Sequence, residues 1–165
     1  MDVVDDELDY RSVNLETDLQ TCLAFRRDAW KASYGSDETF SAAATIKWFQ
    51  RIAKHNPESF LLVWHGDRCI GQLEFMPDLK TAEGESFAHI NLFYLIPEYR
   101  GNGFGQLLHD YVIEALKRWG CRDASLRYIP GNDRAERFYL KNGWYKEGEP
   151  TEERGQLMKK NLSKE

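Results

Sequence analysis

The chain of 165 residues lacks long hydrophobic runs. Its longest unbroken apolar runs are five residues, at 60–64 and 92–96, whereas a membrane-spanning helix needs about 18. The first residues, MDVVDDE, are acidic where a secretory signal would be basic and then apolar. We therefore expect no membrane partner and a cytoplasmic location.

An excess of positive charge is also missing. The chain has 22 Lys and Arg against 27 Asp and Glu, which gives a net charge of −5 and a pI of about 5.5. Binding to nucleic acid through phosphate contacts needs a basic surface, so we expect no nucleic-acid partner. Hydrophobic residues still make up 42% and aromatic residues 13%, enough for a packed core. The length fits a single domain over 1–165.

Cysteine is scarce. Cys22, Cys69 and Cys121 are odd in number and widely spaced, which favours neither a disulfide framework nor a CxxC metal clip. We expect them to be small buried hydrophobic residues in a reducing compartment. The four histidines show no HxxxH or HxH spacing, so we expect no metal site.

Strand-like and helix-like patterns alternate along the chain. Alternating or continuous apolar patterns predict strands at 8–13, 60–64, 69–75, 87–96, 124–128, 144–146 and 156–160. Helical spacing predicts helices at 18–32 and 42–55, the second ended by Asn56-Pro57. His65-Gly66-Asp67 predicts a hairpin. Met76-Pro77-Asp78 is expected to end the third strand, with a polar loop at 80–85.

The centre of the chain predicts an anion site. After the strand at 87–96 comes Arg100-Gly-Asn-Gly-Phe-Gly, and then a helix from 104 to 119 with an apolar side chain at each core position and Gly120 as its C-cap. The first turn of a helix offers unpaired N–H groups and the positive end of its dipole. Glycines allow a phosphate to approach the backbone, and Arg100 adds a cation.

The identity of that phosphate is not fixed by three glycines. A Walker A loop would need a lysine and a hydroxyl after the last glycine, and neither follows Gly105. The dinucleotide fingerprint is GxGxxG, whereas the spacing here is GxGxG, with Gln106 where a glycine would stand. A dinucleotide-binding domain would also need an acidic residue about 20 positions later, a place that Asp123 could fill.

Two blocks of sequence supply the wider context. The first, Leu95-Ile-Pro-Glu-Tyr-Arg-Gly-Asn-Gly-Phe-Gly-Gln-Leu-Leu, contains the [QR]-x-x-G-x-[GA] turn at Arg100, Gly103 and Gly105. The second is N-x-x-A-x-x-[FL]-Y-x-x-x-G-[FW], which runs from Asn132 to Trp144. Together they resemble the signature of the GNAT superfamily of acyl-CoA-dependent N-acyltransferases. The resemblance covers roughly residues 60 to 150, and before that only the order of elements matches.

The resemblance implies an α/β (α+β) fold. Its central sheet is mixed but mostly antiparallel, with about seven strands, about four helices, and strands four and five splayed apart. It also implies acetyl-CoA as acyl donor. Main-chain groups of Phe93, Tyr94 and Leu95 would pair with the pantetheine arm as an added strand does, and Asn132 would contact the same arm. The pyrophosphate would lie on the turn and the first helical residues, namely Arg100, Gly101, Asn102, Gly103, Phe104, Gly105 and Gln106.

Acetylation of an amine has two requirements: the ammonium form of the acceptor must lose a proton, and the departing thiolate must be stabilised. Tyr139 occupies the family's tyrosine position and is the candidate acid; the alternative is aromatic packing in the core. His89, eleven residues before Arg100, is the candidate base in place of a glutamate found in histone-type members. The alternatives are a hydrogen-bonded sheet histidine and ordered water as the base. With no cysteine suited to carry the acyl group, we expect direct attack in a ternary complex.

The resemblance implies that the acceptor is a primary amine of a small molecule or peptide. Acidic groups at Asp37-Glu38, Glu83 with Glu85, and 147–153 would favour a cationic acceptor, or merely keep the surface soluble. Members of the superfamily are often dimers, so a homodimer can form. The rival function is a non-catalytic acyl-CoA-binding regulatory module on the same fold.

For side chains outside the two motifs, the sequence predicts only an approximate location. Glu74 and Gln72 share a strand face that could approach the acceptor. Trp48 and Phe49 are expected in the core, Trp30 and Tyr34 at the mouth, and His109 and His65 in solvent.

Overall fold

The described residues of this computed structural model, 7–163, form seven strands and four α-helices. Most of the acidic N-terminal stretch, residues 1–6, lies outside them, as do residues 164–165. The strands are β1 (Asp9–Ser12), β2 (Phe60–His65), β3 (Arg68–Lys80), β4 (Ser86–Leu95), β5 (Asp123–Tyr128), β6 (Tyr145–Thr151) and β7 (Gly155–Asn161). The helices are α1 (Leu15–Tyr34), α2 (Ala42–His55), α3 (Phe104–Trp119) and α4 (Asp133–Lys141), with short 3-10 helices at Pro57–Ser59 and Pro97–Tyr99.

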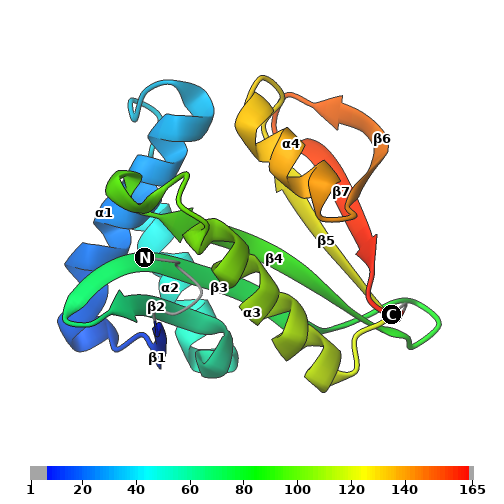
Figure 1. Ribbon diagram of the computed structural model, residues 1–165, viewed down its shortest axis with the longest axis horizontal. Coiled ribbons are helices and arrows are strands. Elements are labelled where there is room, and N and C mark those ends of the chain that lie inside the picture. The colour runs from blue at the N-terminus through cyan, green and yellow to red at the C-terminus, as the bar shows by residue number, and fades with distance from the viewer. Residues whose placement is uncertain (1–6, 164–165) are drawn as a thin grey trace. The chain divides into compact units, whose positions relative to one another are not determined.

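The strand order is β1-β2-β3-β4-β5-β7-β6 (Figure 1). Antiparallel pairs join β1 to β2, β2 to β3, β5 to β7 and β7 to β6. β4 and β5 pair in parallel, through Phe87–His89 and Asp123–Ser125. This mixed, mostly antiparallel sheet with four helices confirms the predicted fold class, and the short parallel ladder is consistent with a splayed pair.

The sequence predicted both ends of α2 and of α3 correctly. α2 starts after Ser41, whose side chain accepts a hydrogen bond from Ala44 N (3.1 Å), and stops at Asn56. α3 spans 104–119 as predicted, and Gly120 follows with φ 87°. α1 is longer than predicted at both ends, because Asn14 caps its start and Gly35, at φ 86°, caps its end.

The predicted end of the third strand was wrong. β3 continues through Met76, Pro77 and Asp78 to Lys80, and the loop starts one residue later than expected. Phe60, the first residue of β2, pairs with Glu74. From Phe75 onward, β3 therefore runs beyond the first residue of β2 and has no partner in that strand. A proline there, which has no N–H, breaks no hydrogen bond to β2.

The chain separates into two compact units. The N-terminal unit comprises residues up to Phe75 together with Leu92–Val112, and the C-terminal unit comprises Met76–Asn91 together with the residues from Ile113 onward. A single domain over 1–165 stays a prediction. Among the described residues, no helix has both the length and the apolarity to cross a bilayer.

In the N-terminal unit, α1 and α2 cover one face of the first strands (Figure 1). The core there consists of Cys22, Phe49, Ile52, Phe60 and Leu62. Strand alternation turns Val63 to the opposite face. A Cβ added at Gly71 on that face would lie 3.3 Å from a methyl carbon of Leu108 of α3, so glycine allows α3 to pack closely.

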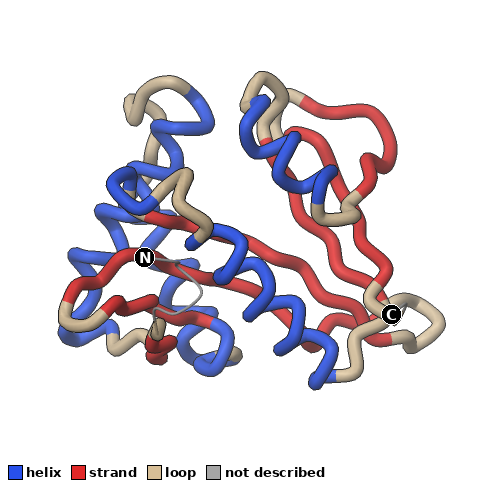
Figure 2. The backbone as a smooth tube through the Cα atoms, in the orientation of Figure 1, coloured by secondary structure: helices blue, strands red, loops and turns tan. Residues whose placement is uncertain are grey.

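In the C-terminal unit, α4 lies along the β5-β7-β6 sheet, as Figure 2 also shows. Tyr128 is buried, and its hydroxyl donates to Glu136 of α4 at 2.6 Å. Trp144 is buried as well, and its main-chain N–H donates to Tyr139 O of α4 at 3.0 Å. The three cysteines of the chain are free thiols; Cys22 and Cys121 are buried as predicted, while Cys69 is half-buried.

Candidate active site

The end of β4 presents main-chain groups away from β3. Ile96 N donates to Ile70 O of β3 at 2.8 Å, and a Cβ at Gly71 would lie 2.6 Å from Tyr94 O. The main chain of Tyr94 and Ile96 therefore faces β3. Because backbone polar groups alternate in direction along a strand, the N–H and C=O groups of Phe93 and Leu95 face the opposite edge. An extended ligand could pair with them there.

The turn between β4 and α3 combines strained backbone with a helix N-terminus. Gly101 and Gly103 have φ values of 81° and 92°, a region that other residues avoid. The helical ladder begins with Leu107 N donating to Gly103 O at 3.3 Å. Phe104, Gly105 and Gln106 therefore have no carbonyl four residues back within the helix. This arrangement suits an anion such as a phosphate.

Arg100 lies at the start of that turn and its guanidinium is already engaged. Nε donates to Leu95 O at 2.7 Å, and Nη2 lies 3.1 Å from Asp28 Oδ2 of α1. The hydroxyl of Tyr94 donates to the same carboxylate oxygen at 2.6 Å. Burial, followed by Asp28, raises the pKa of Tyr94, so this hydroxyl keeps its proton. The positive charge of Arg100 is thus shared with Asp28, a residue that sequence reasoning did not single out.

His89 lies in the parallel-paired stretch of β4, in the C-terminal unit. Its Nδ1 is 2.8 Å from Ser125 Oγ, and Ser125 Oγ donates to Ala88 O at 3.4 Å. His89 and Ser125 are therefore hydrogen-bonded to each other, and the tautomer of the imidazole decides which of the two donates. Burial lowers the pKa of His89, and the charges of Arg127 and Arg154 lower it further. The imidazole is therefore neutral at neutral pH, as a base must be.

α4 carries the second sequence block. Asn132 caps the helix, its Oδ1 accepting from Ala135 N at 3.3 Å. Tyr139 is half-buried, with the rings of Phe138, Tyr128 and Trp144 at 5.7, 6.4 and 6.2 Å. Burial raises the pKa of Tyr139 to about 12, so the phenol remains a hydrogen-bond donor at neutral pH.

A family model described as the acetyltransferase (GNAT) family matches residues 22–144, which are 123 of the 165 residues. The match spans the glycine turn, His89 and Tyr139. This chain belongs to the GNAT acetyltransferase family.

Individual relatives are distant. A mycothiol acetyltransferase from Geodermatophilus obscurus is 29% identical over 90 residues, 54% of this chain but only 29% of the relative, so the chain spans under a third of that protein. The PaiA N-acetyltransferase from Thermoplasma acidophilum, solved with coenzyme A, has a TM-score of 0.67 at 23% identity, covering 94% of this chain and 99% of that one. A ribosomal-protein-alanine N-acetyltransferase from Brucella melitensis has a TM-score of 0.69 at 16% identity, covering 92% and 98%. These structures share the GNAT fold.

One prediction about a side chain of this GNAT protein was wrong. His109 was expected in solvent but is only 3% exposed, with Nδ1 3.1 Å from Asp110 Oδ1 and its ring 5.8 Å from that of Phe93. His109 lies beside the apolar face of α3 and is buried although it is not one of the apolar residues of that face. Trp30 donates to Thr39 Oγ1 at 3.1 Å and packs on Tyr34, which is 44% exposed.

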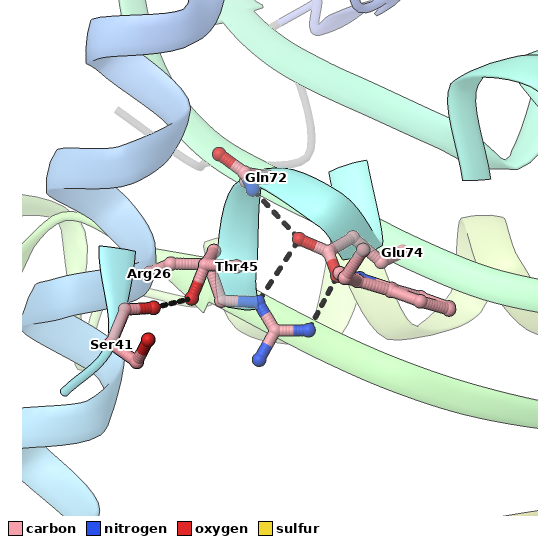
Figure 3. Close-up of polar contacts among 6 residues, drawn as sticks. Arg26, Ser41, Thr45, Gln72 and Glu74 are labelled. Carbon is pink, nitrogen blue, oxygen red and sulfur yellow. Dashed lines mark hydrogen bonds and ion pairs between the residues drawn. The ribbon is translucent and has the colours of Figure 1, made fainter. Parts of the chain in front are cut away.

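Glu74 forms a buried polar cluster in the N-terminal unit rather than an exposed acceptor contact (Figure 3). Its side chain is fully buried and accepts hydrogen bonds from three residues on three elements. Arg26 of α1 donates from Nε (3.2 Å) and Nη2 (2.5 Å), Trp48 Nε1 of α2 at 2.6 Å, and Gln72 Nε2 of β3 at 2.8 Å. Gln72 is fully buried as well. The cluster ties both helices to β3.

Glu74→Ala is therefore expected to destabilise the fold by about 3 kcal/mol. Breaking a buried ion pair costs about 3–5 kcal/mol because a charge is left unpaired, and the low end applies since 24% of the Arg26 side chain remains exposed. Denaturant unfolding would measure the loss. Glu98→Ala breaks an exposed pair with Arg68 at 3.1 Å and should change stability by less than about 1 kcal/mol. Equal effects of the two variants would refute this role of Glu74.

Among residues 7–163, no group of three or more His, Cys, Asp or Glu side chains is placed to hold a metal ion.

Proposed function

We propose that this GNAT protein transfers the acetyl group of acetyl-CoA to a primary amine of a small molecule or peptide, by direct attack within a ternary complex. The observation that carries the proposal is the glycine turn, where positive φ angles at Gly101 and Gly103 lead directly into the first turn of α3. Main-chain amides concentrated at a helix N-terminus suit a pyrophosphate.

The proposed donor site follows from the directions of the main chain. The pyrophosphate lies on the amides from Gly101 to Gln106, and the pantetheine arm pairs with Phe93 and Leu95, whose polar groups face away from β3. The side-chain oxygen Oδ1 of Asn132 accepts the capping hydrogen bond of α4, so its Nδ2 group is the part that would serve the arm.

The proposed attack needs a neutral amine and a stabilised oxyanion. His89, or water, takes the ammonium proton, and the hydrogen bond between His89 Nδ1 and Ser125 Oγ holds the imidazole in place. The N–H of Leu95 faces the same edge as its carbonyl and is the donor proposed for the tetrahedral oxyanion.

Tyr139 stabilises the departing sulfur by hydrogen bonding. Its pKa of about 12 lies above the roughly 8.5 of a free thiol, so complete transfer of its proton to the thiolate would cost on the order of 5 kcal/mol. A donated hydrogen bond supports developing negative charge without that cost. Solvent then supplies the proton that the released CoA thiol needs.

His89→Ala tests the base through the pH–rate profile. Because burial and two arginines lower the pKa of His89 from 6.5, the wild-type profile of kcat/KM should fall on its acid side below pH 6.5. His89→Ala should lose that limb and about 10²-fold in rate at pH 8. His55→Ala, an exposed histidine at the end of α2, is the control. A profile of His89→Ala that superimposes on wild type would assign the step to water.

The function is tested by release of CoA thiol from acetyl-CoA over a panel of polyamines, aminoglycoside-type antibiotics, amino acids and peptides. We expect turnover with at least one cationic amine, since acidic residues 147–153 include four glutamates that would attract it. Binding of acetyl-CoA without turnover by any amine would favour the regulatory module instead. The cytoplasmic location, the homodimer and the lack of a nucleic-acid partner stay predictions.

A further inference from the structure

Asp28 connects α1 to the residues proposed to hold the donor, although it belongs to neither sequence block. A single oxygen, Oδ2, accepts from the Tyr94 hydroxyl at 2.6 Å and from Arg100 Nη2 at 3.1 Å. The two donors come from the end of β4 and the start of the glycine turn. One carboxylate therefore fixes both segments against the same helix.

The contact continues from Arg100 into the main chain. The Nε of Arg100 donates to Leu95 O at 2.7 Å, so the side chain bridges Asp28 and the last residue of β4. Its guanidinium lies over the Tyr94 ring at 5.5 Å, and that ring stacks on Phe25 of α1 at 4.8 Å. The guanidinium thus contacts both the Asp28 carboxylate and the Leu95 carbonyl.

We propose that Asp28 is a positioning residue for acetyl-CoA, acting through Arg100 to hold Leu95 and the glycine turn in the donor-binding geometry. This inference rests on the proposed function and adds a residue to its donor site. Asp28 need not touch the donor, and Arg100 serves as a brace rather than as the cation that neutralises phosphate.

Neither donor of the bridge titrates within the working pH range. An arginine side chain is always protonated in proteins, and the Tyr94 hydroxyl keeps its proton because burial and Asp28 raise its pKa. Both donors to Asp28 are therefore permanent, which suits a positioning role and not a switch.

Asp28→Asn distinguishes two roles of Arg100, positioning of Leu95 and direct binding of phosphate, because they predict opposite changes in the Kd for acetyl-CoA. If Arg100 is a brace, loss of the carboxylate charge lets the guanidinium swing away from Leu95, and the Kd for acetyl-CoA should rise about tenfold, the size expected for a lost charge-assisted bond. If Arg100 binds phosphate directly and Asp28 competes for it, the same substitution should tighten binding. Calorimetry reads both outcomes, and tighter or unchanged binding overturns the proposal.

A second readout separates positioning from general weakening of the fold. The KM for acetyl-CoA should rise in Asp28→Asn, while the KM for the amine stays within about twofold, because the contact holds residues of the donor site and none of the acceptor site. Asp9→Asn is the matched control, since it removes an exposed carboxylate 3.1 Å from Arg11. Equal changes in all kinetic constants, or the same change in the control, would overturn the proposal.

A double-mutant cycle tests whether Asp28 acts through Arg100. Arg100→Gln keeps a residue that the GNAT turn pattern allows at this position. Asp28→Asn should cost about tenfold in the wild-type background and less than about twofold in the Arg100→Gln background. Equal costs would overturn the mechanism. Wild-type protein that binds no acetyl-CoA overturns the proposed function, and this inference with it, whereas wild-type binding with normal Asp28→Asn binding overturns this inference alone.

Discussion

Gly103→Val is expected to weaken acetyl-CoA binding at least 100-fold. Gly103 has φ 92°, and an L-residue in the left-handed region is strained by about 1–2 kcal/mol, more for a β-branched side chain. Two valine methyl groups would also stand where the pyrophosphate should approach the amides of the helix start. Either effect moves the first turn of α3 or fills its anion site. Calorimetric titration with acetyl-CoA measures the loss.

Gly105→Ala is the matched control for that variant. Gly105 does not have a positive φ, a Cβ there would have open space, and the GNAT turn pattern accepts alanine at this position. Its Kd should stay within about threefold of wild type, and circular dichroism should show both variants folded. Wild-type affinity in folded Gly103→Val would remove the glycine turn from the donor site.

Tyr139→Phe is expected to lower kcat by about 10²-fold, the size expected for loss of one hydrogen bond to charge that develops in the transition state, and to leave the Kd for acetyl-CoA within about twofold. Phenylalanine keeps the aromatic packing with Phe138, Tyr128 and Trp144, so the variant removes only the hydroxyl. Because that hydroxyl acts on charge that develops at sulfur, its loss affects the transition state and not the ground state.

Tyr145→Phe gives the comparison for the tyrosine variant. Tyr145 is 49% exposed at the start of β6, and its hydroxyl has no proposed part in the reaction. Stopped-flow or steady-state release of CoA thiol would measure both variants. A Tyr139→Phe enzyme as fast as Tyr145→Phe would leave the packing role of this residue as its only one.

Sequence patterns predicted elements whose signals are local. α2 is bounded by a serine cap and by Asn56-Pro57, and α3 by glycines and a regular apolar stripe, so both were found at their observed ends. The glycine turn was found because a motif fixes residue types within a few positions. The extension of β3 past Pro77 was missed, since it depends on where β2 begins.

The rest of the site depends on contacts between distant positions. Asp28 and Arg100 are 72 residues apart, and no pattern in α1 marks one acidic residue as a partner of the turn. Strand alternation placed Gln72 and Glu74 on one face correctly, but it does not say what covers that face. Arg26 and Trp48 cover it, so a candidate acceptor contact is instead a buried structural carboxylate.

Titration of acetyl-CoA into the wild-type protein by calorimetry tests the donor site most directly. We predict saturable binding at one molecule per chain, with CoA competing for the same site because both share the pyrophosphate and pantetheine groups. Absence of saturable heat with either compound, from protein that circular dichroism shows to be folded, would contradict the account.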